Sequence, residues 1–330
     1  MKRLLAPLLF CLMPAIAAAE CRGANVFDAL PPAEQTAIRA ATDAAPFARG
    51  LLWQATRGAQ RITLLGTYHF DDPRHDAIMA RVAPMLDTAT TLLVEAGPDE
   101  EAALKSDLAK DPALMVAPSG PTLPEALTAE EWEVLSQALK ARGMPPFMAA
   151  KLRPWYIMML LSVPPCAMAD QAALAANGLD QRVIGRAASK GIAVKALEPH
   201  DTVLRLFGDM SQTDQLGMIR SALSTEAEAE DYSATLADSY FAEDARLIWE
   251  LGRHVALQTP GYTPEQVARD FDGMEATLMT ARNRAWIPVL EQAAAAGPVF
   301  AAFGALHLSG ETGVLALLQA QGFTLERLPL

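Results

Sequence analysis

Two short apolar runs in this chain each end at a glycine, and each glycine is followed three residues later by a histidine. The first run, Ile62–Leu65, leads into Gly66–His69, and the second, Val299–Phe303, leads into Gly304–His307. Short apolar runs of this kind are typical of buried strands. A glycine at the end allows a tight turn or a close backbone approach, so the histidine can point into a cleft. The pair therefore predicts two matched strand ends that share a chemical site.

Apolar strand patterns alternate with helical patterns along most of the chain. The strands that we expect are Arg61–Gly66, Thr91–Val94, Ile192–Leu197, Pro298–Phe303 and Phe323–Leu328. The clearest helices are Asp28–Ala45, His75–Leu86, Thr128–Arg142, Leu179–Lys190, Glu275–Ala296 and Gly313–Gln321. This alternation predicts an α/β fold, with a mainly parallel sheet covered by helices. The mostly helical stretches 99–178 and 200–296 are expected as long insertions that cap the site, and residues 20–60 as an N-terminal arm.

The first 19 residues have the pattern of a secretory signal peptide. Lys2 and Arg3 form a positive start, Leu4–Met13 an apolar core, and Ala17–Ala19 the small residues that precede a cleavage site. Cleavage is expected after Ala19, and an uncleaved N-terminal anchor is the alternative. Residues 20–330 are then expected to form one exported α/β domain, periplasmic or secreted, with no stable membrane anchor after cleavage.

The net charge indicates which classes of partner to exclude, and the cysteines bear on the redox compartment. The formal net charge of −12 argues against nucleic acid and offers no basic patch for anionic lipid. Cleavage would leave Cys21 and Cys166, and an oxidising compartment permits a disulfide between them. Two unpaired thiols are the alternative.

Four expected strands end at polar residues that suit a site, namely His69, Glu95, Glu198 and His307. In open α/β sheets, ligands bind beyond the carboxyl ends of the strands, so these side chains are expected to share one cleft. Neutral imidazoles with a carboxylate are common ligands of a catalytic divalent metal that keeps one position open. For each histidine taken alone, a hydrogen-bonded structural role is the alternative.

Arg282 and Asn283 fall within an apolar stripe of the last long helix, whereas Arg284 falls off that stripe and is expected to face solvent. An unpaired charge in such a stripe is costly. Arg282 is therefore expected either to form a structural salt bridge with a buried carboxylate or to face the site. There it would orient a ligand or stabilise developing negative charge.

Several other candidates have a weaker pattern. His75 is interpreted as a surface residue, with a second ligand near His69 as the alternative, and Asp180 is interpreted as a helix N-cap. His200 and His254 have no partner pattern. The chain has no Gly-x-Ser-x-Gly elbow, no His-Glu-x-x-His motif, no phosphate loop and no dinucleotide fingerprint. These absences leave the paired strand ends as the best candidate site.

A series of short motifs resembles the TraB/PrgY/GumN family, in the order that the family has them, and is most similar to its bacterial GumN-like branch. The ordered set is fairly specific and covers nearly the whole chain after the leader. The matching segments are Leu64–His69, Leu93–Glu95, Leu152–Trp155, Gly178–Asp180, Leu197–Glu198, Arg282–Trp286 and Gly304–Leu308.

The resemblance implies a fold shared with Tiki membrane proteases and, more distantly, with erythromycin esterases (EreA) and ChaN-like haem-binding proteins. In Tiki-like members the paired Gly-x-x-His motifs and a carboxylate belong to a divalent-metal-dependent protease site. Carried over by position, these residues are His69, Glu95 and His307, with Arg282 or Asn283 as the family's polar helix residue. The sequence lacks the C-terminal membrane anchor of Tiki proteins, which argues against a membrane-tethered substrate.

The leading hypothesis is an exported, peptidase-like metallohydrolase that acts on a peptide or a small molecule. His69 and His307 would hold Mn²⁺, Co²⁺ or Zn²⁺. Glu95 would be either a metal ligand or the base that activates metal-bound water, and Glu198 would take the other of these two roles. One alternative is a metal-free, esterase-like hydrolase in which either histidine is the general base and Arg282 positions an anionic group. Another is a non-catalytic binding protein for haem, a metal or an envelope ligand.

Overall fold

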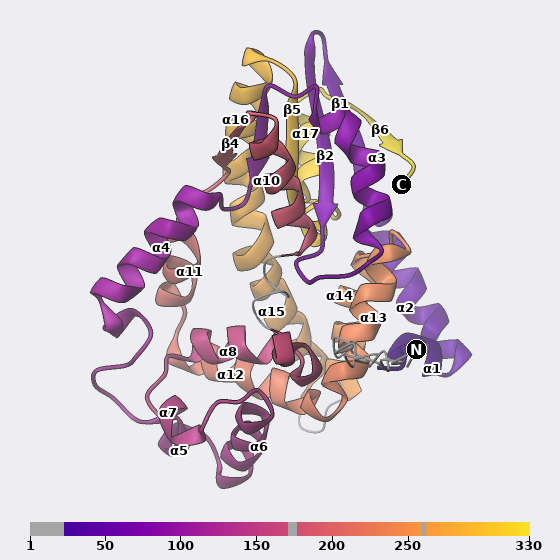
Figure 1. Cartoon of the computed structure of the whole chain (residues 1–330). Coiled ribbons are helices and arrows are strands. Elements are labelled where there is room, and N and C mark those ends of the chain that lie inside the picture. Colours follow the sequence, from indigo (N-terminus) through magenta and orange to yellow (C-terminus); the bar gives the residue numbers. More distant parts are fainter. Residues whose placement is uncertain (1–22, 171–176, 259–261) are drawn as a thin grey trace, which may run out of the picture.

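The computed structural model describes residues 23–170, 177–258 and 262–330 (Figure 1). The signal peptide predicted at 1–19 lies outside the described residues, as does Cys21. Cleavage after Ala19 and a bridge from Cys21 to Cys166 therefore stay predictions. Among the helices that are described, none combines the length and the apolar character needed to cross a membrane.

A six-stranded sheet with the order β4-β3-β5-β2-β1-β6 forms the centre of the molecule. Its strands are β1 (Leu52–Arg57), β2 (Gln60–Thr67), β3 (Thr91–Val94), β4 (Ala193–Ala196), β5 (Val299–Gly304) and β6 (Thr324–Leu328). The pairs β2–β5, β5–β3 and β3–β4 are parallel, whereas β1 is antiparallel to both of its neighbours. The predicted α/β class with a mainly parallel sheet is confirmed.

Strand β1 corrects one expectation. Residues 20–60 were expected to form an arm with an extended segment that begins at Gly50–Trp53, but Leu52–Arg57 of that segment lies inside the sheet between β2 and β6. A tight hairpin joins β1 to β2, with Arg57 paired to Gln60 and Gly58 at a left-handed φ of 59°. Polar Gln54 and Thr56 interrupt the apolar pattern of this strand, which is why it did not resemble a buried strand.

Helices cover both faces of the sheet. Helices α3 (His75–Leu86) and α10 (Leu179–Ser189) pack on one face, and α16 (Ala281–Ala296) and α17 (Val314–Ala320) on the other. Strand β5 serves both faces, because Val299, Ala301 and Phe303 join one core cluster while the residues between them join the other. This two-sided burial accounts for the continuous apolar run.

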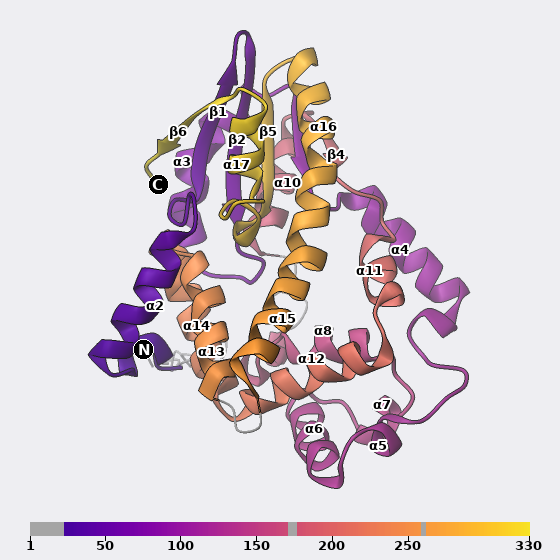
Figure 2. The same cartoon turned by 180° about the vertical axis from the view of Figure 1, so that it is seen from behind.

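The remaining helices lie mostly beyond one end of the sheet, as the two opposite views show (Figures 1 and 2). The arrow of β2 points toward them, so α8 and α11–α15 lie beyond the carboxyl ends of the parallel strands (Figure 1). The predicted helical insertions thus cap that edge. The bounds of the helices that do not cover the faces of the sheet are α1 (Val26–Ala29), α2 (Pro32–Ala44), α4 (Pro98–Lys110), α5 (Leu123–Ala126), α6 (Ala129–Ala141), α7 (Pro146–Ala149), α8 (Pro154–Leu161), α11 (Thr202–Asp209), α12 (Gln212–Ser224), α13 (Ala229–Phe241), α14 (Arg246–Gln258) and α15 (Pro264–Glu275).

The expected helix Glu275–Ala296 is the second half of a longer helical rod. Helix α15 ends at Glu275, a π-helical turn spans Ala276–Thr280, and α16 continues from Ala281. Such π turns are often found at functional sites. This one comes immediately before Arg282 and Asn283, the two polar residues that sequence analysis selected on this helix.

Candidate functional site

The four polar strand-end residues come from neighbouring parallel strands. His69 follows β2, Glu95 follows β3, Glu198 follows β4, and His307 ends the short turn η5 (Ala305–His307) after β5. The register places the ends of these strands level, because Val94 of β3 pairs with both Ala302 and Ala196. The side chains therefore emerge at one edge of the sheet.

Arg282 lies at the centre of this group. Its Nη2 donates to Oε2 of Glu95 at 2.6 Å and to Oε1 of Glu198 at 2.7 Å, and its Nε donates to Oε2 of Glu198 at 2.8 Å. Its Nη1 lies 3.2 Å from Nε2 of His307. The guanidinium thus forms salt bridges with two carboxylates and also faces the candidate site. The two alternatives expected for Arg282, a salt bridge and a position facing the site, therefore occur together.

His307 is held in one orientation by Asn283. Its Nδ1 lies 2.6 Å from Oδ1 of Asn283, so Nδ1–H donates and Nε2 keeps a lone pair directed at Arg282. The amide of Asn283 donates in turn to the carbonyl of Thr312 at 2.9 Å. Burial lowers the pKa of His307 to about 4. The ring is therefore neutral near pH 7 and can act as a ligand or an acceptor.

His69 is held through the same ring nitrogen by a carboxylate. Its Nδ1 lies 2.7 Å from Oδ2 of Asp180, whose other oxygen accepts from the hydroxyl of Thr67. Desolvation by itself lowers the pKa of His69, but the charge of Asp180, its hydrogen bond and the charge of Glu95 together outweigh this effect and raise the pKa to about 9. Because 63% of the His69 side chain is exposed, the ring is accessible from solvent.

Glu95 lies between the two histidines. Its Oε1 accepts from the backbone N–H of Gly304 at 2.6 Å and lies 4.0 Å from Nε2 of His307. Burial by itself raises the pKa of Glu95, but the charges of His307, Arg282 and His69 lower it to about 2. Since His307 is neutral near pH 7, Arg282 and His69 are the cations that keep this carboxylate ionised there.

Glu198 has both of its oxygens occupied. Arg282 binds it through two nitrogens, and Nε1 of Trp286 donates to its Oε2 at 3.0 Å. The Glu198 side chain is only 10% exposed. The arrangement fixes Arg282 in place and leaves less room for Glu198 to act as a ligand or a base.

The glycines of the paired motifs permit close approach. A Cβ on Gly304 would lie 3.2 Å from Oε1 of Glu95, 3.5 Å from Nε2 of His69 and 3.7 Å from Cδ2 of His307. A Cβ on Gly66 would lie 2.9 Å from Cα of Ala305, so the two motifs contact each other across the sheet edge. Both glycines are needed for space and not for a left-handed turn.

Asp180 is the site residue that sequence analysis did not assign to the site. It was interpreted as a helix N-cap, but Gly178 holds that position and Asp180 binds His69. A Cβ on Gly178 would lie 2.1 Å from the carbonyl oxygen of His69, so only glycine allows the start of α10 to approach the end of β2. The Gly178–Asp180 motif was a signal, but its partner is 111 positions away.

His75 corrects a second expectation. It was interpreted as a surface residue, yet it is 0% exposed. Its ring packs beside Tyr68, Tyr240 and Phe241, and its Nε2 lies 2.9 Å from the carbonyl of Phe70. The polar neighbours of His75 in the sequence concealed these aromatic contacts, which come from the segment after β2 and from α13.

The remaining candidates lie outside the group. Nε2 of His200 lies 2.8 Å from Oδ2 of Asp107, and Nε2 of His254 lies 2.8 Å from Oε2 of Glu34. Arg284 is exposed, as expected. These residues provide matched controls for substitutions within the site.

The residue types of the site fit a divalent metal. Each imidazole has its Nδ1 bonded to a partner, the usual outer-shell arrangement of metal-binding histidines, and Glu95 adds an ionised carboxylate. The cradle beside Gly304, which a Cβ would fill, lies among these three side chains. Within the part of the chain that the structure describes, however, no three His, Cys, Asp or Glu side chains form a ready metal-binding group.

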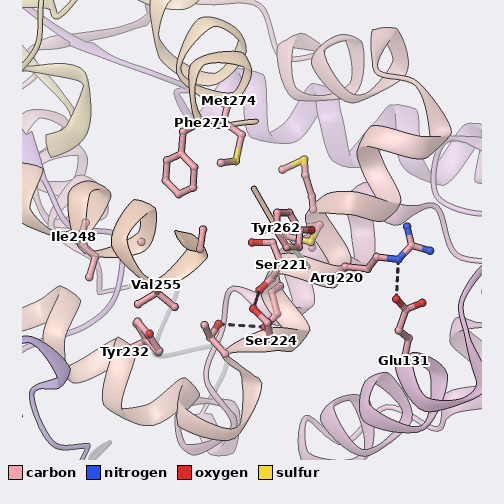
Figure 3. A pocket seen from close by; sticks show the side chains of 16 residues that line it. Glu131, Arg220, Ser221, Ser224, Tyr232, Ile248, Val255, Tyr262, Phe271 and Met274 are labelled. Atoms are coloured by element: carbon pink, nitrogen blue, oxygen red, sulfur yellow. Dashed lines mark hydrogen bonds and ion pairs between the residues drawn. The ribbon is translucent and has the colours of Figure 1, made fainter. Parts of the chain in front are cut away.

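A separate cavity of about 540 Å³ lies within the helical insertions (Figure 3). Its wall is largely apolar and includes Met158, Met218, Met274 and Phe271. The pair Arg220–Glu131 at 2.8 Å lies on one side of it. None of the strand-end residues lines this cavity, so it is distinct from the candidate site.

Comparison with known proteins gives one assignment. The model described as the TraB/PrgY/gumN family matches residues 51–327 of this chain. This range contains β1 to β5, all of β6 except its last residue, and every residue of the strand-end group. The search of curated proteins found no match.

Proposed function

The chain belongs to the TraB/PrgY/gumN family, and we propose that it is a peptidase-like hydrolase with a divalent metal at the strand-end site. One observation carries the proposal, namely the approach of Glu95, His69 and His307 to a single spot beside Gly304. Two imidazoles with fixed Nδ1 partners and an ionised carboxylate are the donors that such an ion requires. His69 is protonated near pH 7 without the ion and would release its Nε2 proton when it binds.

We assign His69, Glu95 and His307 as the residues that hold the ion. When bound, the ion would supply a Lewis acid that polarises the bond to be cleaved. Mixed nitrogen and oxygen donors select poorly among Mn²⁺, Co²⁺ and Zn²⁺, so the proposal covers all three.

The other residues of the site orient these ligands and place charge. Asp180 and Asn283 fix the two imidazole rings, since each binds one Nδ1. Glu198 and Trp286 hold Arg282, whose guanidinium would stabilise negative charge that develops on the substrate. Glu95 is ionised and serves as a ligand or as the base that accepts a proton from the attacking water.

Metal content, measured beside a broad peptide-cleavage screen, tests this function. We expect wild-type protein to retain a divalent metal and to cleave a subset of peptides, and His69→Ala and His307→Ala to lose both properties. The matched control is His254→Ala, because His254 pairs with Glu34 away from the site. Metal at wild-type occupancy in both site variants would remove the assignment.

A metal-free hydrolase is the second candidate, and the contact of Arg282 with His307 favours it. Nη1 of Arg282 lies 3.2 Å from Nε2 of His307, where a metal ion would otherwise bind. In that case His69 with Asp180 would transfer protons, and Arg282 would position an anionic group. Activity that survives exhaustive chelation supports this candidate. Tight retention of haem or another ligand without turnover would instead indicate a binding protein.

We also propose that the protein is exported to the periplasm or secreted, because residues 1–19 have the pattern of a signal peptide. Sequencing the N-terminus of the mature protein tests this proposal. Glu20 as the first residue is expected, and an intact Met1 in the cytoplasmic fraction would contradict it.

A further inference from the structure

We infer that Arg282 competes with the metal ion for the site. When no ion is bound, its guanidinium supplies the positive charge there and contacts Glu95 and His307. The inference rests on the proposed function. It predicts that removal of the guanidinium makes the site bind a divalent ion more tightly, although Arg282 lies at the centre of the site.

Arg282 already contacts two of the three proposed ligands. Its Nη2 lies 2.6 Å from Oε2 of Glu95, and its Nη1 lies 3.2 Å from Nε2 of His307. An imidazole nitrogen has one lone pair, and Asn283 fixes the tautomer that directs this lone pair at Arg282. His307 therefore cannot bind a metal ion until Nη1 of Arg282 moves away.

Arg282 cannot move far from this position. Glu198 binds it through two nitrogens, the carbonyl of Leu278 accepts from its Nη1 at 3.2 Å, and its guanidinium lies 5.0 Å from the ring centre of Trp286. A guanidinium that has released His307 would still lie beside the ion. Two cations in a partly buried site repel each other, and this repulsion weakens metal binding.

The charges of the two glutamates also make Arg282 and the metal alternatives. If Arg282 were absent, Glu95 and Glu198 would lose the cation that pairs with both of these partly buried carboxylates, which is unfavourable. A divalent ion can neutralise Glu95 in place of the guanidinium, so the metal and Arg282 are alternatives at that carboxylate. In wild-type protein the metal thus takes the place of the guanidinium at Glu95, while Arg282 stays bound to Glu198.

The decisive experiment compares Arg282→Met with Arg284→Met in the purified full-length mature protein. Affinity for Mn²⁺ and Zn²⁺ is measured by competition with a chelator of known affinity. We expect Arg282→Met to bind at least about tenfold more tightly than wild type. Arg284 is exposed on the same helix two residues away, so Arg284→Met is expected to match wild type. Equal or weaker binding by a folded Arg282→Met overturns the inference.

A second variant covers the case in which Arg282→Met fails to fold. The double substitution Arg282→Met/Glu198→Gln removes the carboxylate that Arg282 would leave unpaired, and the same gain in affinity is expected from it. If wild type binds a His307-dependent metal but neither variant binds more tightly, only the competition by Arg282 is wrong. If wild type and all variants bind no metal, the proposed function and this inference are both wrong.

Discussion

Asn283 and His307 form a buried pair in which Oδ1 of the amide accepts from Nδ1 of the imidazole at 2.6 Å. The amide side chain is 1% exposed and the histidine 6%. The pair joins the last long helix to the end of β5, and it determines which nitrogen of His307 faces the site.

Asn283→Ala should therefore reduce both stability and function. It leaves Nδ1–H of His307 buried without a partner, which costs about 1–3 kcal/mol of unfolding free energy. Loss of such an outer-shell partner also lowers metal affinity or activity by roughly 10- to 100-fold. Urea denaturation and chelator competition measure the two effects. Ala285→Gly on the exposed side of the helix is a control for backbone changes, with an expected loss of about 1 kcal/mol and no change in metal affinity.

The neutral state of His307 predicts a loss of stability in acid. Its pKa is lowered from 6.5 to about 4 in the folded protein, so the unfolded chain binds the extra proton first as the pH falls. Stability should fall between about pH 6.5 and pH 4, by at most about 1.4 kcal/mol per pH unit from this residue. The unfolding free energy of chelator-treated wild type and His307→Gln, measured across this window, checks the prediction. An equally steep decline in His307→Gln would contradict it.

The raised pKa of His69 predicts a loss of stability at high pH. Its folded pKa is raised from 6.5 to about 9, so its contribution to stability is fully present below pH 6.5 and is lost as the pH rises through 9. The ring is largely exposed, so solvent screening should keep this contribution below about 1 kcal/mol. NMR titration should show the pKa of His69 falling in Asp180→Asn. Asp107→Asn, beside His200, should leave the pKa of His69 unchanged.

Gly304→Ala should disable the site without unfolding the protein. The added methyl group would lie 3.2 Å from Oε1 of Glu95, which would have to shift, and 3.5 Å from Nε2 of His69, so it would occupy the cradle between them. We expect at least about a tenfold loss of metal affinity or activity, because small shifts of catalytic groups have large effects. Gly217→Ala is the control, since a Cβ there has open space and alanine favours the helix. Wild-type affinity and activity in Gly304→Ala would contradict the proposal that the space beside Gly304 holds the metal ion.

The sheet and most of the strand-end group could be predicted because the relevant signals are local. Thr91–Val94 and His75–Leu86 were predicted with the bounds that the structure has, since their apolar patterns are continuous and end at clear breaks. Parallel strands that end at one sheet edge then bring Glu95 and Glu198 together.

The remaining features depend on contacts between distant segments. Asp180 reaches His69 only because Gly178 lets α10 approach the backbone after β2, and no periodicity encodes that distance. The aromatic surrounding of His75 and the pairing of β1 with β6 likewise arise from residues far apart in the chain. The contact between Arg282 and His307 depends on the rotation of one helix, which sequence spacing alone does not determine.

The π-helical turn Ala276–Thr280 has a consequence for this rotation. Such a turn accommodates one more residue than an α-helical turn, and each residue of an α-helix advances the side chains by about 100°. The wide turn therefore absorbs one residue within a single turn, and α16 keeps the angular phase that it would have in a regular helix one residue shorter. The faces of α15 and α16 are consequently offset by one position in the sequence, and a regular helical spacing drawn across the turn would assign them to different sides. Arg282 and Asn283 face the sheet edge in a phase that only the spacing within α16 describes.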